Sequence, residues 1–292
     1  MRINTNVASL NTQESSVINS NNLRSSLEKL SSGFRINKAS DDASGLAIAD
    51  KLRTQKNSIS QSINNANSAI SLIQIADKAM GEQSNILDIV KTKLIQASTA
   101  TTSSEGRISL SKDINKLLTQ LDNIAAQTNY NGISLLQESS TSKGTAESFT
   151  FLLGEKSNDT ISSSDKTRSN TTGLGNINIA NSLEKLLNDT SGDGTSLTVD
   201  KSKKYMAVID KGLNDLNSMR SDFGSTQNQI ESAARNLMTS KTNIAAAESV
   251  IRDIDYSDES ARFNKSNIIG QASMYAQSQA NARPQSILKL LT

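Results

Sequence analysis

The chain has 292 residues, a formal net charge of +2 at pH 7, no cysteine, no histidine, no tryptophan and a single proline, Pro284. Without cysteine it can form neither disulfides nor a thiolate metal site, and without histidine it lacks the commonest metal ligand and general base. A charge near zero gives no long-range attraction toward nucleic acid or anionic lipid. Aromatic residues make up only 3% of the chain, which predicts a thin core. The composition favours a structural protein over an enzyme, with no cofactor, nucleic acid or membrane partner.

No segment of the sequence looks like a secretion signal or a membrane anchor. The first ten residues, MRINTNVASL, lack the apolar core of a secretory signal peptide. No window approaches the run of about 18 apolar residues that a membrane-spanning helix needs. If the protein leaves the cell, we therefore expect export without a cleaved signal peptide.

The N-terminal segment predicts a helix with a discontinuous apolar stripe, made of Ile3, Val7, Leu10, Val17 or Ile18, Leu23, Leu27 and Leu30. Chain ends are usually frayed and polar, so an apolar stripe here indicates a contact. Two interpretations remain open. The stripe packs on the rest of the same chain, or neighbouring copies of the protein cover it.

An acidic pair, Asp41-Asp42, follows this segment and lies close to Arg35 and Lys38. Paired carboxylates are also used in acid–base catalysis, but we interpret the pair as the start of a helix. Ser40 or Asp41 would be the N-cap, because negative charge is favourable in the first turn of a helix. We expect Arg35 to form a bridge, either within the chain or to another copy.

The next segment predicts a long amphipathic helix. Every seventh residue from Leu52 is apolar: Leu52, Ile59, Ala66, Ile73, Met80, Leu87 and Leu94. A second apolar stripe slips by one place, as a helix with 3.6 residues per turn does against a repeat of seven. The pattern predicts one helix over about 44–99, on the order of 80 Å long at 1.5 Å per residue. A break at 103–106 separates it from a shorter amphipathic stripe over 110–124.

Turn signals dominate the middle of the chain. Asn131-Gly132 is a strong tight-turn signal. From about 139 to 203 the helical periodicity gives way to Ser, Thr, Gly, Asn and Asp. Within this region 149–152 and 160–161 predict one small hairpin, and the remainder predicts exposed loop.

A second long helix follows, because the apolar spacing of seven returns at Ile209, Leu216, Phe223, Ile230, Leu237, Ile244 and Ile251. None of the amphipathic helices is stable alone, but they can bury one another's stripes. The sequence therefore predicts a mainly α protein, an elongated antiparallel helical rod with a terminal coiled coil, a small β-hairpin region and a short variable middle.

The C-terminal segment predicts another apolar stripe, made of Ala261, Ile268, Ala272, Tyr275 or Ala276, Ile287, and Leu290 or Leu291. The same two interpretations apply as at the N-terminus. An extended rod leaves little surface to cover both terminal stripes, so we favour contacts with neighbouring copies.

Several motifs, in order along the chain, resemble the signatures of the bacterial flagellin family. The N-terminal half contains LSSGFRIN (30–37), ASDDASGLAIA (39–49) and QTNYNG (127–132). The C-terminal end contains IRDIDY (251–256), QSQAN (277–281) and ILKLL (287–291). The resemblance covers about 1–140 and 205–292, and the unmatched middle corresponds to the variable region of the family.

The resemblance implies a structural subunit that polymerises into the flagellar filament for swimming motility. The terminal helices, 1–35 and 258–292, would form an inner coiled-coil tube. Residues 36–138 and 204–257 would form a helical rod with a spoke, and 139–203 a short exposed region. The inner-tube side chains would be Ile3, Val7, Leu10, Leu23, Leu27, Leu30, Ile268, Ala272, Tyr275, Ile287, Leu290 and Leu291. The spoke side chains would be Arg35, Asn37, Asp41 and Asp42.

The resemblance also implies location and partners. Flagellins are exported unfolded through the flagellar type III apparatus, so the protein is expected outside the cell, in the flagellum. Its expected partners are many copies of itself, an export chaperone, and the cap and hook-junction proteins.

One departure from the family pattern falls on the first long helix. Flagellins that Toll-like receptor 5 senses carry a Gln-Arg-x-Arg-Glu-Leu patch there, whereas this chain has Asp88-Ile89-Val90-Lys91-Thr92-Lys93. Ile89 and Lys93 remove a bidentate donor and an apolar contact, while the expected acidic residue on the next helix is present as Asp113. The resemblance thus implies the subgroup that escapes the receptor, with weak or no activation. Neutral drift on an exposed face accounts for the same residues.

Hydroxyl side chains in the middle are candidates for O-linked sugar, namely Ser162, Ser163, Ser164, Thr171 and Thr172. Simple solubility explains them equally well. Two alternative functions remain, a flagellin-like protein at the hook–filament junction and a secreted helical adhesin. The unbroken rod stripes and both terminal signatures favour the filament subunit.

Overall fold

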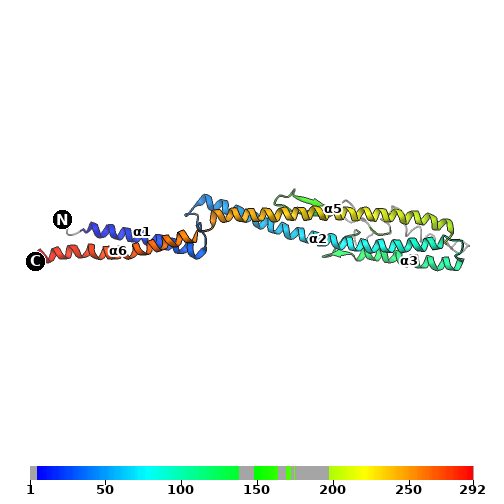
Figure 1. Ribbon diagram of the computed structural model, residues 1–292, viewed down its shortest axis with the longest axis horizontal. Helices are drawn as coiled ribbons and strands as arrows, with labels where there is room; N and C mark the ends of the chain where they lie inside the picture. The colour runs from blue at the N-terminus through cyan, green and yellow to red at the C-terminus, as the bar shows by residue number, and fades with distance from the viewer. Residues whose placement is uncertain (1–4, 138–147, 164–168, 172–173, 175–196, 292) are drawn as a thin grey trace. The chain divides into compact units, whose positions relative to one another are not determined.

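The computed structural model describes residues 5–137, 148–163, 169–171, 174 and 197–291, with side chains as far as Arg283. The elements, coloured in chain order in Figure 1, are α1 (Val7–Ser32), α2 (Ala43–Ala97), α3 (Ser104–Gln127), β1 (Asn129–Tyr130), β2 (Ile133–Ser134), β3 (Thr150–Leu152), β4 (Thr160–Ser162), α5 (Val199–Arg252) and α6 (Tyr256–Leu291). Two compact units divide the chain. Unit 1 contains residues 1–57 and 241–292, and unit 2 contains residues 58–240. The predicted fold class, mainly α with small antiparallel hairpins, is confirmed.

The first long helix, α2, begins one residue after its cap. Asp42 Oδ1 accepts a hydrogen bond from the backbone N–H of Gly45 at 2.9 Å, as an N-cap side chain does. The expected cap at Ser40 or Asp41 is therefore wrong, because the Asp41 carboxylate binds backbone N–H groups of the preceding loop instead.

The break between α2 and α3 is shorter than the sequence predicted. α3 begins at Ser104, and Ser103 Oγ accepts a hydrogen bond from the backbone N–H of Gly106 at 3.1 Å. The expected break at 103–106 is therefore wrong for residues 104–106, which are helical. Those residues form the first turn of α3, because Ser103 satisfies a free N–H and Glu105 places negative charge near the helix N-terminus.

The core of unit 2 lies between α2, α3 and α5, and it contains the predicted heptad positions. Those buried in this core are Ala66, Ile73, Met80, Leu87, Leu94, Ile114, Leu121, Ile209, Leu216, Phe223 and Ile230. Ile59 is buried as well. Asp77 pairs with Arg220 at 2.8 Å, and Lys91 pairs with Asp210 at 2.5 Å. Residue numbers rise along α2 as they fall along α5, so the two helices run antiparallel in this unit. The expected mutual burial of the apolar stripes is confirmed.

Unit 2 contains the predicted small hairpin and the predicted tight turn, and the turn also closes a hairpin. β1 and β2 pair antiparallel around Asn131-Gly132, whose φ angles are 51° and 81°. Positive φ at both turn residues defines the type I′ turn that Asn-Gly favours. β3 and β4 pair antiparallel with Phe151 opposite Ile161, as the sequence predicted.

Unit 1 brings the two ends of the chain together. α1 and α6 lie side by side in Figure 1, drawn in blue and in orange to red. Asn6 Nδ2 donates to the carbonyl of Ala280 at 2.9 Å, and Asn19 Nδ2 donates to the carbonyl of Ser266 at 2.8 Å. The two helices therefore run antiparallel, as expected for a terminal coiled coil.

Candidate functional site

The loop between α1 and α2, residues 33–42, is held against the end of α5; we call it the junction loop. The Arg35 backbone N–H donates to the carbonyl of Arg252 at 2.7 Å, and its guanidinium donates to the carbonyl of Ile251 at 2.6 Å. The guanidinium of Arg252 lies 4.3 Å from the centre of the Phe34 ring, within cation–π range. Arg35 thus forms a bridge within the chain.

Asp41 organises the junction loop from inside. Its Oδ2 accepts hydrogen bonds from the backbone N–H groups of Asn37 and Lys38, both at 3.0 Å. These donors to the carboxylate, first Lys38 and then Asn37, lower the pKa of Asp41 below its usual value. Asn37 Nδ2 in turn donates to Ser32 Oγ at 2.8 Å. The predicted spoke residues therefore act as a structural clamp, with the carboxylates used for backbone capping.

Gly45 is required where the junction loop meets α2. A Cβ atom at this position would lie 2.7 Å from Ile36 Cδ1 and 2.5 Å from Asp42 Oδ2. Ile36 is 1% exposed, so it has little room to move. The start of α2 therefore packs directly on the junction loop.

The contact between α1 and α6, which we call the α1–α6 seam, is made mostly by small and polar side chains. Most of the less exposed residues follow alternating steps of three and four along each helix, the spacing of a coiled-coil contact. They are Ser9, Thr12, Ser16, Asn19, Leu23, Ser26 and Leu30 on α1, and Glu259, Phe263, Ser266, Gly270, Ser273, Gln277 and Ala280 on α6. The most buried members are polar, namely Asn19, Ser26 and Glu259.

Most of the predicted inner-tube residues point away from this seam. Val7, Leu10, Leu27, Ile268 and Tyr275 are exposed over 58%, 54%, 56%, 67% and 76% of their surface, and Ala272 is exposed as well. Leu23 and Leu30 differ, because they lie half-buried in the seam. Ile3 lies outside the described residues, and so do the side chains of Ile287, Leu290 and Leu291. The paired helices thus have a polar contact and an apolar outer surface.

The predicted receptor patch lies on α2 in unit 2, and ion pairs occupy its two lysine side chains. Lys93 Nζ lies 3.0 Å from Asp113 Oδ2, and Lys91 pairs with Asp210 on α5. Ile89 is 46% exposed, and Thr92 Oγ1 donates to the Ile89 carbonyl. Asp88 belongs to the same stretch of helix. Sequence reasoning placed Lys93 and Asp113 in one patch but did not foresee that they pair with each other.

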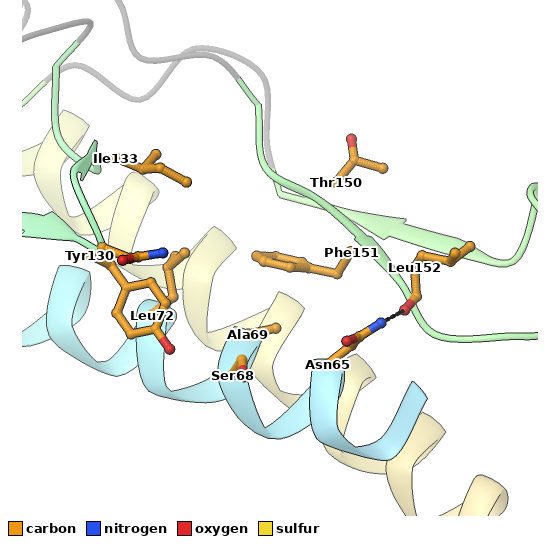
Figure 2. A pocket seen from close by; sticks show the side chains of 10 residues that line it. Asn65, Ser68, Ala69, Leu72, Tyr130, Ile133, Thr150, Phe151 and Leu152 are labelled. Atoms are coloured by element: carbon orange, nitrogen blue, oxygen red, sulfur yellow. Dashed lines mark hydrogen bonds between the residues drawn. The ribbon is translucent and has the colours of Figure 1, made fainter. Parts of the chain in front are cut away.

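A groove of about 300 Å³ in unit 2 was not predicted (Figure 2). Its floor is α2, at Asn65, Ala69 and Leu72, and its walls are the two hairpins, at Tyr130 and Phe151. Asn65 Nδ2 donates to the carbonyl of Leu152 at 3.3 Å, which fixes the second hairpin on the helix. No sequence signal identifies this groove, because it depends on how the hairpins pack on α2.

The predicted hydroxyl sites differ in accessibility. Ser162 is exposed. Ser163 is buried, and its Oγ accepts from the Phe149 backbone N–H at 2.9 Å. Thr171 is also buried, and its Oγ1 donates to Asp122 at 2.9 Å. Ser164 and Thr172 lie outside the described residues.

Within the same described ranges, neither a membrane-spanning helix nor a metal site is present. None of the helices there is both long and apolar enough to cross a bilayer. In the part of the chain that the structure describes, His, Cys, Asp and Glu side chains nowhere gather in a group of three that could hold a metal ion.

Paired terminal helices with an exposed apolar surface, together with a separately completed helical core, define a self-associating structural protein. Residues 3–141 match the bacterial flagellin N-terminal helical region, and residues 206–291 match the bacterial flagellin C-terminal helical region. The chain therefore belongs to the bacterial flagellin family. It is a structural subunit of the flagellar filament, the extracellular fibre of bacterial motility.

Relatives of full length support this assignment. Flagellin of Bacillus subtilis is 34% identical over 306 residues, and flagellin of Halalkalibacterium halodurans is 33% identical over 291 residues, with each alignment covering all of both chains. A solved structure described as a flagellar hook-associated protein from Vibrio parahaemolyticus has a TM-score of 0.60 and 11% identity, covering 72% of this chain and 99% of that one. At that identity the likeness shows the fold alone, so the hook–filament junction alternative gains no support from it.

Proposed function

We propose that α1 and α6 form the inner tube of the filament and that their outward apolar side chains are the surface on which neighbouring subunits pack. The observation that carries this proposal is the inverted polarity of the helix pair, with Asn19, Ser26 and Glu259 inside and Ile268 and Tyr275 outside. A pair that buried its apolar side chains would be complete by itself. This pair is complete only when other copies cover it.

The available burial energy fits assembly by several neighbours. Full burial of a large apolar side chain contributes about 1.5–3 kcal/mol. Scaled by their exposed fractions, Val7, Leu10, Leu27, Ile268 and Tyr275 offer roughly 5–9 kcal/mol per subunit, which is an upper estimate. Ordering terminal segments opposes assembly by about 1–2 kcal/mol for each residue fixed. The apolar surface therefore favours polymerisation when several neighbours contribute together.

The remaining parts of the chain receive roles that follow from this arrangement. Residues 1–35 and 258–292 are assigned to the inner tube, 36–138 and 204–257 to the rod, and 139–203 to the outer surface. The junction loop, through Arg35, Asn37, Asp41 and Asp42, acts as the spoke that fixes the tube helices to α5. The hydrogen bonds of Arg35 to the end of α5 support this role.

In this proposal the subunit is exported and added to the filament by the route that the family uses. The subunit leaves the cell through the flagellar export apparatus without a cleaved signal peptide, bound beforehand by an export chaperone. At the filament it meets the cap and hook-junction proteins and then other copies of itself. The mostly polar seam supports this route, because a helix pair with few apolar side chains in its contact separates readily.

We also propose that the subunit activates Toll-like receptor 5 weakly or not at all. The residues that support this are Ile89 and Lys93, which replace a charged donor and an apolar contact of the receptor-sensed pattern. In addition, Lys93 already pairs with Asp113 at 3.0 Å, so a receptor would have to compete for that carboxylate. A reporter-cell assay with pure monomer tests the proposal, and potency equal to that of a receptor-sensed flagellin would refute it.

O-linked modification, if the native filament carries it, is assigned first to Ser162. Among the candidates within the described residues, this hydroxyl is exposed, whereas Ser163 and Thr171 are buried and hydrogen-bonded. Site-resolved peptide mass spectrometry of native filament checks the assignment. Sugar on Thr171 rather than Ser162 would contradict it.

Seeded polymerisation of a truncated chain tests the main proposal. Removing 285–292 is expected to leave unit 2 folded, because its core lies between α2, α3 and α5, and to stop filament growth from seeds. Circular dichroism and electron microscopy of the same sample provide the two readouts. Long filaments from the truncated chain would refute the role of the C-terminal helix.

A further inference from the structure

The α1–α6 seam contains few of the large apolar side chains that normally fix how two helices align; they are Leu23, Leu30 and Phe263, each half-buried. Its buried members are Asn19, Ser26 and Glu259, and small residues occupy much of the remainder. Interlocking Leu and Ile side chains would set one alignment by shape. Here another feature must specify which turn of α1 lies against which turn of α6.

Asn19 and Gly270 provide that feature. Asn19 is 8% exposed, and its Nδ2 donates to the carbonyl of Ser266 at 2.8 Å. Gly270 lies one turn farther along α6, and a Cβ atom there would lie 3.1 Å from Asn19 Nδ2. The amide therefore occupies the space that a side chain on α6 would otherwise fill.

We propose that Asn19 and Gly270 set the register of α1 against α6 in the assembled subunit. The inference rests on the proposed assembly function, because register matters only where both helices must present their apolar faces together. Gly270 is the only glycine in the sequence from 256 to 291, so every other register places a Cβ atom opposite Asn19. A single buried Asn fixes register in coiled coils in the same way.

A register error would disturb the outer surface more than the seam. A slip by one heptad moves one helix about 10 Å along the other, at 1.5 Å per residue. The small seam residues tolerate such a slip, since few of them interlock. The outward side chains, such as Leu10 on α1 and Tyr275 on α6, would no longer present one continuous apolar surface to a neighbour.

A double-mutant cycle tests the proposal, because the proposal predicts the direction in which the critical concentration changes. In an unobstructed helix, Gly→Ala is favourable because alanine has the higher helix propensity. Gly270→Ala is expected to raise the critical concentration for seeded polymerisation at least tenfold, because the added Cβ atom would push Asn19 away from the Ser266 carbonyl that it binds. In the Asn19→Ala background the same substitution should raise it less than about twofold. Gly224→Ala on α5 is the matched control, because nothing lies within 4 Å of the added Cβ atom.

Introduced cysteine pairs measure the register of α1 against α6 directly, because the chain contains no native cysteine. Ser9 Oγ and Asn281 Oδ1 are 2.7 Å apart, so Ser9→Cys with Asn281→Cys reports the native alignment. Ser9→Cys with Met274→Cys reports a slip of one heptad. Only cross-links within one chain, identified from the monomer band on a denaturing gel, are counted, and they are measured whether or not filaments form.

The native pair alone should cross-link in the otherwise unchanged chain. Asn19→Leu, which adds an apolar contact but no register signal, should give both cross-links and poor filaments. The proposal is overturned if the Asn19→Leu variant retains only the native cross-link, or if both cysteine pairs cross-link in the chain that keeps Asn19. It is also overturned if Gly270→Ala changes the critical concentration no more than Gly224→Ala does. A chain that forms the native cross-link but never polymerises would instead refute the proposed assembly function and leave the register assignment standing.

Discussion

Ile268→Ser tests whether the exposed apolar face of α6 promotes polymerisation. Ile268 is 67% exposed, and full burial of isoleucine contributes about 1.5–3 kcal/mol. Burying the exposed part would thus contribute about 1–2 kcal/mol per subunit. Because each 1.4 kcal/mol or so changes an equilibrium constant tenfold, the critical concentration should rise about 5- to 30-fold.

The assay measures free subunit remaining after seeded growth, by sedimentation, at several total concentrations. Ile268→Leu is the control, since it keeps the apolar area and should shift the critical concentration less than about twofold. Thermal unfolding should be unchanged in both variants, because the altered side chain lies outside the seam. An unchanged critical concentration for Ile268→Ser would refute the assignment of this face to assembly.

Three further predictions concern the core, the junction loop and the receptor patch. Leu216→Ala removes a fully buried side chain of unit 2 and should lower the free energy of unfolding by about 2–5 kcal/mol in urea; a loss well below that range would contradict the burial. Because the pKa of Asp41 is lowered in the folded chain, its stabilising contribution is present above the usual aspartate pKa and is lost as pH falls through the folded value. Thermal melts down to about pH 2 should show this loss in the unchanged chain and a smaller one in Asp41→Asn, and equal losses would exclude a role for this carboxylate. The double variant Ile89→Arg with Lys93→Leu should gain activity in a Toll-like receptor 5 reporter assay over the unchanged chain, and no gain would show that other positions prevent recognition.

The rod helices and hairpins were predictable because local signals and final packing agree there. Residues such as Met80, Leu87 and Leu216 recur at sevens and are fully buried. Asn131-Gly132 specifies its turn through backbone angles that those two residues tolerate best. In both cases the same residues determine the local element and its tertiary contact.

The terminal helices were less predictable because their two faces have opposite roles. Apolar periodicity identifies the outer face, through Leu10 and Ile268, but it cannot reveal a contact made by Ser, Asn and Gly residues. It also grouped Leu23 and Leu30 with the outer residues, although those two side chains lie in the seam. The helix cap was misplaced because two adjacent carboxylates could have capped α2. The Asp41 carboxylate binds backbone N–H groups of the junction loop, so Asp42 caps the helix.

Electron cryo-microscopy of filaments grown from the pure subunit tests the central claim most directly. The expected map shows α1 and α6 of each subunit in the innermost layer, with Val7, Leu10, Ile268 and Tyr275 against α1 or α6 of neighbouring copies and Asn19 against Ser266 of its own chain. A map in which those four side chains face solvent, or in which the innermost layer is built from unit 2, would contradict it.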